Sequence, residues 1–253
     1  MMNRIIYWFR FVYIYKNWIN ILIKRILKTE TKNIVLRNNI TIQSDNNESL
    51  SVISDEIFVL GKYTRKFLAI KRGDVVVDIG AHIGIFSIYA NICDALKIYA
   101  YEPDPENFNL LQKNTKANKI KNIIPSQYAV TDKVGNIDFY VHANSGGNSV
   151  YKQNLQNTKH IKVKSITIEK ILADNKIDYV DFLKIDCEGS EGLIFLNIKP
   201  NILKRIKKIA LEYHDNVSPL KHNQILIILK HNNFTTKLIQ TDKTFGYILA
   251  EKI

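Results

Sequence analysis

Several features that would point to particular protein classes are rare in this sequence. Its 253 residues include only two cysteines, Cys93 and Cys187, so a disulfide framework is excluded, and no C-x-x-C pair is present for zinc. The five prolines and ten glycines are too few for a collagen-like or disordered chain. Apolar residues surround both cysteines, which indicates buried, reduced thiols and favours a cytoplasmic protein.

Long uncharged runs and blocks of like charge are also lacking. Within residues 1–28 the uncharged stretches are far shorter than the roughly 18–20 residues that span a bilayer. No small-residue cleavage site follows, which speaks against a signal peptide. The net charge of +12 would suit phosphate, nucleic acid or an anionic membrane. Because no block of five or more Lys and Arg residues occurs, we favour lysines spread over solvated faces as its explanation.

The first 28 residues combine apolar and aromatic side chains with charges of one sign. The charged residues are all basic: Arg4, Arg10, Lys16, Lys24, Arg25 and Lys28. At about 100° per residue, one helix would place a narrow polar stripe at Asn3, Arg10, Asn17, Lys24 and Lys28. Such a helix is typical of peripheral contact with a membrane, here its inner face. The alternative, which we favour, is packing on the domain or on a second copy of the chain in a homodimer.

The order of the hydrophobic periods predicts an α/β protein. Two short strands are expected in residues 33–44, and a helical lead-in is expected in residues 50–70. From residue 75 onward, strands and helices alternate, which predicts a doubly wound, mostly parallel sheet with helices on both faces. The expected strands are 75–79, 97–101, 122–130, 180–185 and 207–213, and the expected helices are 83–93, 105–118, 167–174 and 218–231.

Two strand pairs complete the expected architecture. Residues 136–142 and 160–165 alternate in period two around a Gly/Asn/Ser loop at 146–157, which predicts a pair inserted beside the main sheet. Residues 233–240 and 245–252 predict a closing antiparallel hairpin. We therefore divide the chain into an amino-terminal segment, 1–50, and one α/β domain, 51–253.

The strongest motif is V-V-V-D-I-G-A-H-I-G at residues 75–84. It joins an apolar strand, an acid, a glycine turn and a helix. A dinucleotide fold would carry G-x-G-x-x-G to make room for pyrophosphate, whereas here three residues separate Gly80 from Gly84. Asp78, directly before the turn, would repel a pyrophosphate, but it can order the turn or meet an ammonium group. The motif therefore favours a ligand with an amino-acid tail and speaks against a nicotinamide dehydrogenase.

A second motif, Y-E-P-D-P at residues 101–105, follows the next expected strand. Glu102 comes 22 residues after Gly80. A carboxylate at the end of this strand can accept two hydrogen bonds from a ribose diol. In this order and at this spacing, the two motifs predict a nucleoside-bearing cofactor.

Residues 55–250 resemble the FkbM family of S-adenosylmethionine-dependent methyltransferases. The motifs that carry the resemblance are DIGAHIG (78–84), AYEPDP (100–105), AVTDKVG (129–135), GGNSV (146–150), FLKIDCEGSE (182–191) and IALEYHD (209–215). The resemblance implies a class I, Rossmann-like methyltransferase with a seven-stranded sheet. It also implies S-adenosyl-L-methionine as cofactor and methyl transfer to oxygen on a sugar, a glycan or another small molecule.

The same resemblance implies where the cofactor binds. It places the methionine part near the turn after the first main strand, the ribose on an acid after the second, and the adenine after the third. The corresponding residues here are Asp78, Gly80, Ala81, His82 and Gly84 for the turn, Glu102 for the ribose, and Ala129 and Asp132 for the adenine. His82 stands where we expect Asn most often, but its imidazole can still hydrogen-bond the turn.

Acidic residues after the fourth strand are candidates for catalysis. If the acceptor is an alcohol, a base should remove its proton as the new bond forms. We expect either Asp186 or Glu188 to be this base, with the other orienting the acceptor; alternatively Asp186 anchors the cofactor or the loop and Glu188 caps the next helix. His214 is a third candidate because a neutral imidazole suits proton removal near pH 7, although an exposed turn histidine is the plainer interpretation. We also expect Glu212 to face the acceptor pocket, and Ser149 and Tyr151 of the inserted loop to close over the cofactor or the acceptor.

Two further functions and a metal site remain as alternatives. Asp186, Glu188, Glu212 and Asp215 could bind Mg²⁺, but they lack tight ligand spacing and we expect no metal. The net charge favours a nucleic-acid (RNA) methyltransferase, yet residues 186–189 lack the D/N-P-P-Y/F loop of amino-methylating enzymes, so we expect no nucleic-acid partner. A membrane-associated module that binds the cofactor without turnover is the other alternative.

Overall fold

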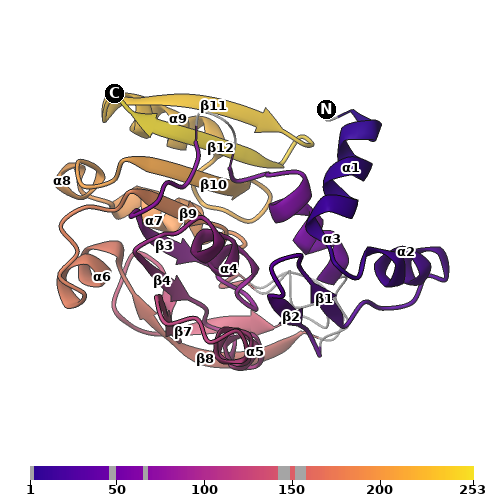
Figure 1. Ribbon diagram of the computed structural model, residues 1–253. Helices are drawn as coiled ribbons and strands as arrows, with labels where there is room; N and C mark the ends of the chain where they lie inside the picture. The colour runs from indigo at the N-terminus through magenta and orange to yellow at the C-terminus, as the bar shows by residue number, and fades with distance from the viewer. Residues whose placement is uncertain (1–2, 46–49, 65–67, 142–148, 152–157) are drawn as a thin grey trace.

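The computed structural model describes residues 3–45, 50–64, 68–141, 149–151 and 158–253 (Figure 1). Its main sheet contains the strands β3 (Val75–Ile79), β4 (Lys97–Tyr101), β5 (Ile123–Ser126), β9 (Phe182–Ile185), β10 (Lys208–His214), β11 (Phe234–Gln240) and β12 (Phe245–Lys252). The order across the sheet is β11-β12-β10-β9-β3-β4-β5. The pairings from β5 to β10 are parallel, and β12 is antiparallel to both of its neighbours. This confirms the doubly wound fold with a closing hairpin.

Helices cover both faces of the main sheet because its central strands are apolar on both sides. Val76, Ile98 and Phe182 pack against α4 (Ile85–Ile92) and α5 (Pro105–Ala117). Their sequence neighbours, Val77 and Leu183 among them, belong to the apolar cluster of the opposite face. The helices in that cluster are α6 (Ile168–Asp174), α7 (Glu191–Asn197), α8 (Pro200–Leu203) and α9 (His222–His231). No bounds were predicted from the sequence for the short helices α7 and α8.

The amino-terminal segment forms two helices, so the prediction of one continuous helix is wrong. Helix α1 (Arg4–Ile14) and helix α2 (Trp18–Ile26) run in different directions (Figure 1). Between them, Tyr15 pairs with Leu36 in an antiparallel bridge, and the Lys16 N–H donates to the Val35 carbonyl at 2.7 Å. Because of this pairing, the backbone at Tyr15 is extended rather than helical. The residues of the predicted polar stripe therefore lie on two separate helices.

A hairpin of β1 (Asn33–Val35) and β2 (Thr41–Gln43) lies against α5, as the sequence predicted for two strands in 33–44. Asparagine side chains in α5 and at its carboxyl end form hydrogen bonds with the backbone N–H and carbonyl groups at the edge of β2. Asn118 accepts from the Thr41 N–H at 2.8 Å and donates to the Thr41 carbonyl at 2.7 Å. Asn114 makes the same pair of hydrogen bonds with Gln43. The hairpin edge is thereby joined to the α/β domain.

This junction gives a testable stability difference. Asn118→Ala removes both hydrogen bonds to Thr41 and leaves two backbone groups of β2 without their partners. We expect the free energy of unfolding to fall by about 2 kcal/mol, measured by urea denaturation. Lys116→Ala, an exposed change on the same helix, is the control and should leave the free energy of unfolding unchanged. Equal stability of the two variants would show that the asparagine does not hold the hairpin.

Two predicted elements have different limits in the structure. Helix α3 (Leu50–Ser54) continues into a π-helical turn, η1 (Asp55–Val59), and residues 60–64 are irregular, so the helical lead-in expected over 50–70 is too long. The strand expected over 122–130 is two strands, β5 and β6 (Ala129–Val130), in different sheets. A tight turn separates them, in which the Tyr128 N–H donates to the Ser126 carbonyl at 3.1 Å.

The inserted strand pair forms a second small sheet. Strands β7 (Gly135–Val141) and β8 (Lys159–Ile166) pair antiparallel, and β6 joins β8 in parallel. Most of the loop between them, predicted over 146–157, lies outside the described residues, which include only 149–151. Cys93 and Cys187 are unpaired, as expected, but they are half-buried rather than fully buried.

Candidate active site

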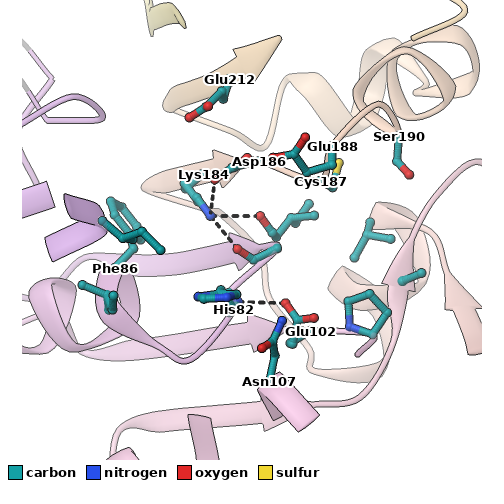
Figure 2. A pocket seen from close by; sticks show the side chains of 18 of the residues that line it. His82, Phe86, Glu102, Asn107, Lys184, Asp186, Cys187, Glu188, Ser190 and Glu212 are labelled. Atoms are coloured by element: carbon teal, nitrogen blue, oxygen red, sulfur yellow. Dashed lines mark hydrogen bonds and ion pairs between the residues drawn. The ribbon is translucent and has the colours of Figure 1, made fainter. Parts of the chain in front are cut away.

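A cavity lies at the carboxyl ends of the central strands (Figure 2). Seven of the residues predicted for cofactor binding or catalysis line it: Gly80, Ala81, His82, Glu102, Ala129, Asp186 and Glu188. The other four predicted residues are not among the described residues that line this cavity: Asp78, Gly84, Asp132 and His214. The sequence therefore located the cavity, while some of its motif residues lie behind the cavity wall.

The turn after β3 is built by close backbone packing. Gly80 has φ of 71°, and a Cβ atom there would lie 1.7 Å from the Asp186 carbonyl oxygen. Only glycine allows the loops after β3 and β9 to approach this closely. Gly84, with φ of 91°, instead packs against α5, where an added Cβ would lie 2.5 Å from Leu111. The second glycine therefore serves helix packing rather than access to the cavity.

The buried side chains of Asp78 and Lys184 stabilise this turn. The Asp78 side chain is fully buried, accepts from the Ser87 hydroxyl at 2.7 Å and lies 3.3 Å from the Lys184 ammonium. Lys184 donates to the Gly80 carbonyl at 2.6 Å. Burial opposes the charge of Lys184, but Asp78 and Asp186 outweigh it, so the pKa of Lys184 lies above its ordinary value. Asp78 is therefore connected to the turn through Lys184.

Glu102 presents a carboxylate to the cavity from the end of β4. Its two oxygens accept from the backbone N–H groups of His82 at 2.8 Å and Asp104 at 2.9 Å. Burial is the main reason that the pKa of Glu102 rises to about 7, with His82 and the two N–H groups acting against it. A carboxylate offers about four acceptor positions, so both oxygens keep capacity for a further hydrogen bond. These remaining acceptor positions fit the two hydroxyl donors of a ribose diol.

Apolar side chains form the neighbouring wall. Ala129 and Val130 of β6 line the cavity together with Tyr128, Phe139 and Val150. This slot lies beside Glu102 and suits a flat aromatic base. An acid for a diol, an apolar slot and a tightly bent glycine turn are the parts that S-adenosylmethionine requires, so the residues present fit this cofactor.

Three polar side chains meet at the other end of the cavity. The Tyr63 hydroxyl donates to Asp186 at 2.8 Å and also lies within hydrogen-bonding distance of Glu212. Burial, reinforced by the charge of Asp186, raises the pKa of Glu212 to about 8. Because a phenol carries one proton, both contacts are satisfied when Glu212 is protonated. Burial disfavours ionisation of Asp186, but Lys184 and His214 outweigh it and lower its pKa.

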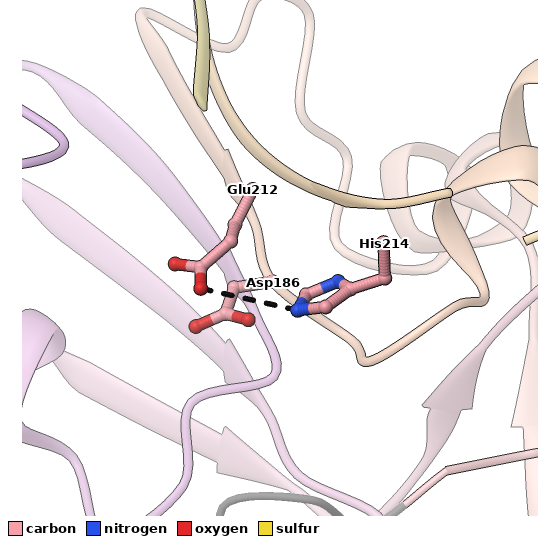
Figure 3. A group of neighbouring side chains, drawn as sticks. All are labelled: Asp186, Glu212 and His214. Atoms are coloured by element: carbon pink, nitrogen blue, oxygen red, sulfur yellow. Dashed lines mark ion pairs between the residues drawn. The ribbon is translucent and has the colours of Figure 1, made fainter. Parts of the chain in front are cut away.

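His214 lies among carboxyl groups at the end of β10. Its Nδ1 is 3.1 Å from Glu191, and its Nε2 is 3.3 Å from Glu188. Figure 3 shows the third neighbour, Glu212, 3.9 Å from Nε2. Burial opposes protonation, but Glu191 and the other acids raise the pKa of His214 to about 10. The imidazole is therefore protonated near neutral pH, which speaks against the neutral base considered from the sequence.

The loop that carries Glu188 is held in an unusual conformation. Glu188 has φ of 52°, in the left-handed region, and burial raises the pKa of its carboxyl to about 8, against the opposing effect of His214. Glu191 accepts from the N–H groups of Cys187 at 3.1 Å and Gly189 at 2.8 Å. Both N–H groups belong to the loop before α7, so Glu191 orders this loop, and the N-cap residue Ser190 makes no side-chain capping hydrogen bond, so the capping role considered for Glu188 is not observed. Ser149, expected to close over the site, donates to the Glu188 carbonyl at 2.5 Å.

Lys184 and Glu191 belong to the FLKIDCEGSE motif, but no individual role was predicted for them or for Tyr63. Lys184 could have been noticed as a charged residue inside an otherwise apolar strand, and Glu191 as the third acid after β9. Tyr63 had no such signal, because it reaches Asp186 from an irregular segment 123 residues away.

One part of the site also has the spacing of a metal centre. Oxygen and nitrogen atoms of Asp186, Glu212 and His214 lie within 4.8 Å of one another (Figure 3). Their present contacts are with Tyr63, Lys184 and Glu188, which already supply hydrogen bonds and opposite charge. This spacing was not recognised in the sequence, because Asp186 follows β9 whereas Glu212 and His214 lie within β10.

Comparisons with known proteins show the family of this chain. The family model of the methyltransferase FkbM domain matches residues 78–236. The chain is 25% identical over 230 residues to 31-O-demethyl-FK506 methyltransferase FkbM of Streptomyces tacrolimicus, covering 79% of this chain and 87% of that protein. It is 26% identical over 169 residues to hexuronic acid methyltransferase AglP of Haloferax volcanii, covering 66% and 67%.

A solved structure of precorrin-6y C5,15-methyltransferase from Geobacter metallireducens, 14% identical, covers 86% of this chain and 95% of its own, with a TM-score of 0.46. The match of the family model extends from Asp78, before the glycine turn, into β11 and includes the residues that line the cavity after β4 and β9. The chain therefore belongs to the FkbM family of S-adenosylmethionine-dependent methyltransferases.

Proposed function

We propose that this enzyme methylates a hydroxyl oxygen of a sugar or another small molecule. The observation that carries the proposal is the Glu188 carboxyl, which lines the cavity 3.3 Å from His214, is half-buried and has a pKa raised to about 8. A group with this pKa is suited to accept the proton of an alcohol. The names of two relatives support the same class of acceptor, since one refers to a 31-O position and the other to a hexuronic acid.

The cofactor would be held by residues on three sides of the cavity. Glu102 would accept hydrogen bonds from the ribose hydroxyls, and the backbone at Gly80 and Ala81 would meet the methionine part. Ala129 and Val130 would contact the adenine. When bound, S-adenosylmethionine supplies a methyl group that its positive sulfur has activated for displacement.

The remaining residues would prepare the acceptor. Glu188, in its ionised form, takes the proton of the acceptor hydroxyl as the oxygen attacks. Asp186 stays ionised and, with the Tyr63–Glu212 pair, orients the acceptor by hydrogen bonds. His214, as a cation 3.3 Å from Glu188, stabilises the carboxylate until the proton arrives. Because the cavity walls are largely apolar, they also exclude water from the reaction.

The acceptor class can be tested with methyl-tritiated S-adenosylmethionine. The protein would be incubated with separated sugars, uronic acids and other hydroxylated small molecules from cell extracts, and with total RNA. We expect label in a small molecule as a methyl ether, which withstands mild alkali. Label that alkali releases would identify a carboxyl ester, and label in RNA would support the nucleic-acid alternative; either result would contradict the proposal. Cofactor binding without any labelled product would favour the non-catalytic module.

A further inference from the structure

The two amino-terminal helices are fixed to the domain through one buried acid. Asp55 of η1 lies 2.9 Å from the Arg25 guanidinium and accepts from the Tyr15 hydroxyl at 2.9 Å. The Tyr7 hydroxyl also donates to Asp55. Phe11, Tyr15 and Ile21 are fully buried beside this network. Helices α1 and α2 therefore have a defined inner face and a defined outer face.

The outer faces of both helices are apolar. On α1, large side chains recur at intervals of four: Ile5 is 76% exposed, Phe9 72% and Tyr13 73%. The rings of Phe9 and Tyr13 stack with centroids 6.2 Å apart. On α2 and its end, the exposed residues are Ile19, Ile23, Ile26 and Leu27. We call these seven side chains the outer apolar face. Regular spacing on two helices distinguishes this face from scattered surface residues.

The charges around the outer apolar face all have one sign. Residues 3–28 contain no Asp or Glu, and their charged residues are Arg4, Arg10, Lys16, Lys24, Arg25 and Lys28. Arg25 is directed inward to Asp55, whereas Arg4, Lys16 and Lys28 are exposed. An apolar surface bordered by cations and carrying aromatic rings suits the interface of an anionic bilayer.

We propose that the outer apolar face docks on an anionic phospholipid bilayer. A second copy of the chain is the less suitable partner, because a two-fold interface would bring the same cationic border against itself. No helix in the described part of the chain has the length and apolar content needed to cross a membrane. The helices would therefore lie in the plane of the interface, with Phe9 and Tyr13 among the acyl chains and headgroups.

Docking there would place the cavity close to the bilayer. Arg10 of α1 donates to the Phe58 carbonyl of η1 at 3.0 Å. Glu56 and Ile57, in the same turn, line the cavity. Figure 1 shows α1, α2 and α3 together at one end of the molecule. The helix that carries part of the docking face thus contacts the turn that forms one wall of the cavity.

Co-sedimentation of the full chain with vesicles tests the proposal. The vesicles would be phosphatidylcholine alone, or three parts phosphatidylcholine to one part phosphatidylglycerol. We expect binding to the anionic vesicles, and high salt should weaken it because exposed charges are screened. The double variant Phe9→Ser/Ile23→Ser should lower the vesicle affinity about tenfold or more, because two exposed apolar side chains are lost.

Matched variants separate docking from general surface effects. Leu96→Ser/Ile227→Ser removes two exposed apolar residues elsewhere and should retain vesicle binding. Cofactor affinity, measured by calorimetry, should be the same in both double variants, which shows that each is folded. Unchanged vesicle binding by Phe9→Ser/Ile23→Ser would overturn the proposal. So would a wild-type dimer in light scattering that this variant converts to a monomer, since the face would then join two copies.

Discussion

Replacing Glu188 by Gln should lower kcat by a factor of about 10² to 10³ while KM changes little. Glutamine keeps the size of the side chain and its contact with His214, but it cannot take up the proton of the acceptor hydroxyl. The rate would be measured with the acceptor that the tritium experiment identifies. The expected loss is large because few groups could replace Glu188 as the base. Among the described residues that line the cavity, Glu212 is the other carboxyl group whose pKa is raised to about 8.

The pH profile distinguishes Glu188 from Glu212. A general base acts in its ionised form, so kcat should rise with pH through about 8 and then level off, following the pKa of Glu188. Glu188→Gln should abolish this rise, whereas Glu212→Gln should retain it. His214→Asn should move the rise to higher pH, because the imidazolium lowers the pKa of Glu188 and its removal leaves burial unopposed.

An exposed glutamate serves as a matched control for this series. Glu106→Gln makes the same chemical change at the start of α5, outside the cavity, and should have wild-type kcat at every pH. If Glu188→Gln kept both the wild-type rate and the rise near pH 8, Glu188 would not be the base. Asp186 would then be the remaining carboxylate after β9 to examine.

Glu102→Ala should weaken binding of S-adenosylmethionine and of its demethylated product about 100-fold, or about 3 kcal/mol by calorimetry. The alanine variant loses the acceptor for two ribose hydroxyls and also frees the N–H groups of His82 and Asp104 from their partner. Glu102→Gln keeps one carbonyl oxygen and should show a smaller loss. Unchanged affinity in Glu102→Ala would contradict the assigned ribose site.

The protonation of Glu102 adds a second signature. Because burial raises its pKa to about 7, the carboxyl gains a proton as pH falls through 7 and loses acceptor capacity. Wild-type affinity for the cofactor should therefore decrease below pH 7. Glu102→Gln should lack this decrease, because an amide does not titrate there. Glu106→Ala, the control for the alanine variant, should retain both wild-type affinity and its pH dependence.

Local sequence patterns determined much of the architecture. The apolar strand at Val75–Ile79, the glycine turn after it and Glu102 follow one another within 28 residues, so their arrangement is set by chain geometry. Alternating strands and helices also predicted the parallel sheet. A strand made of consecutive apolar residues exposes apolar side chains on both faces of the sheet, so helices must cover both faces. Once these strands pair in parallel, their carboxyl ends and the acids that follow meet at one edge.

The ion pairs and hydrogen bonds of the charged side chains at that edge could be seen only in the folded structure. Lys184 ties Asp78 to the Gly80 turn across two strands, and Tyr63 reaches Asp186 from a distant irregular segment. The pKa of His214 depends on acids of the loop after β9, which its own sequence neighbourhood does not reveal. Burial and long-range contacts fix protonation states, and neither is a property of a local pattern. Local patterns were therefore enough to predict where the candidate site lies, whereas the ionisation of its side chains follows from packing.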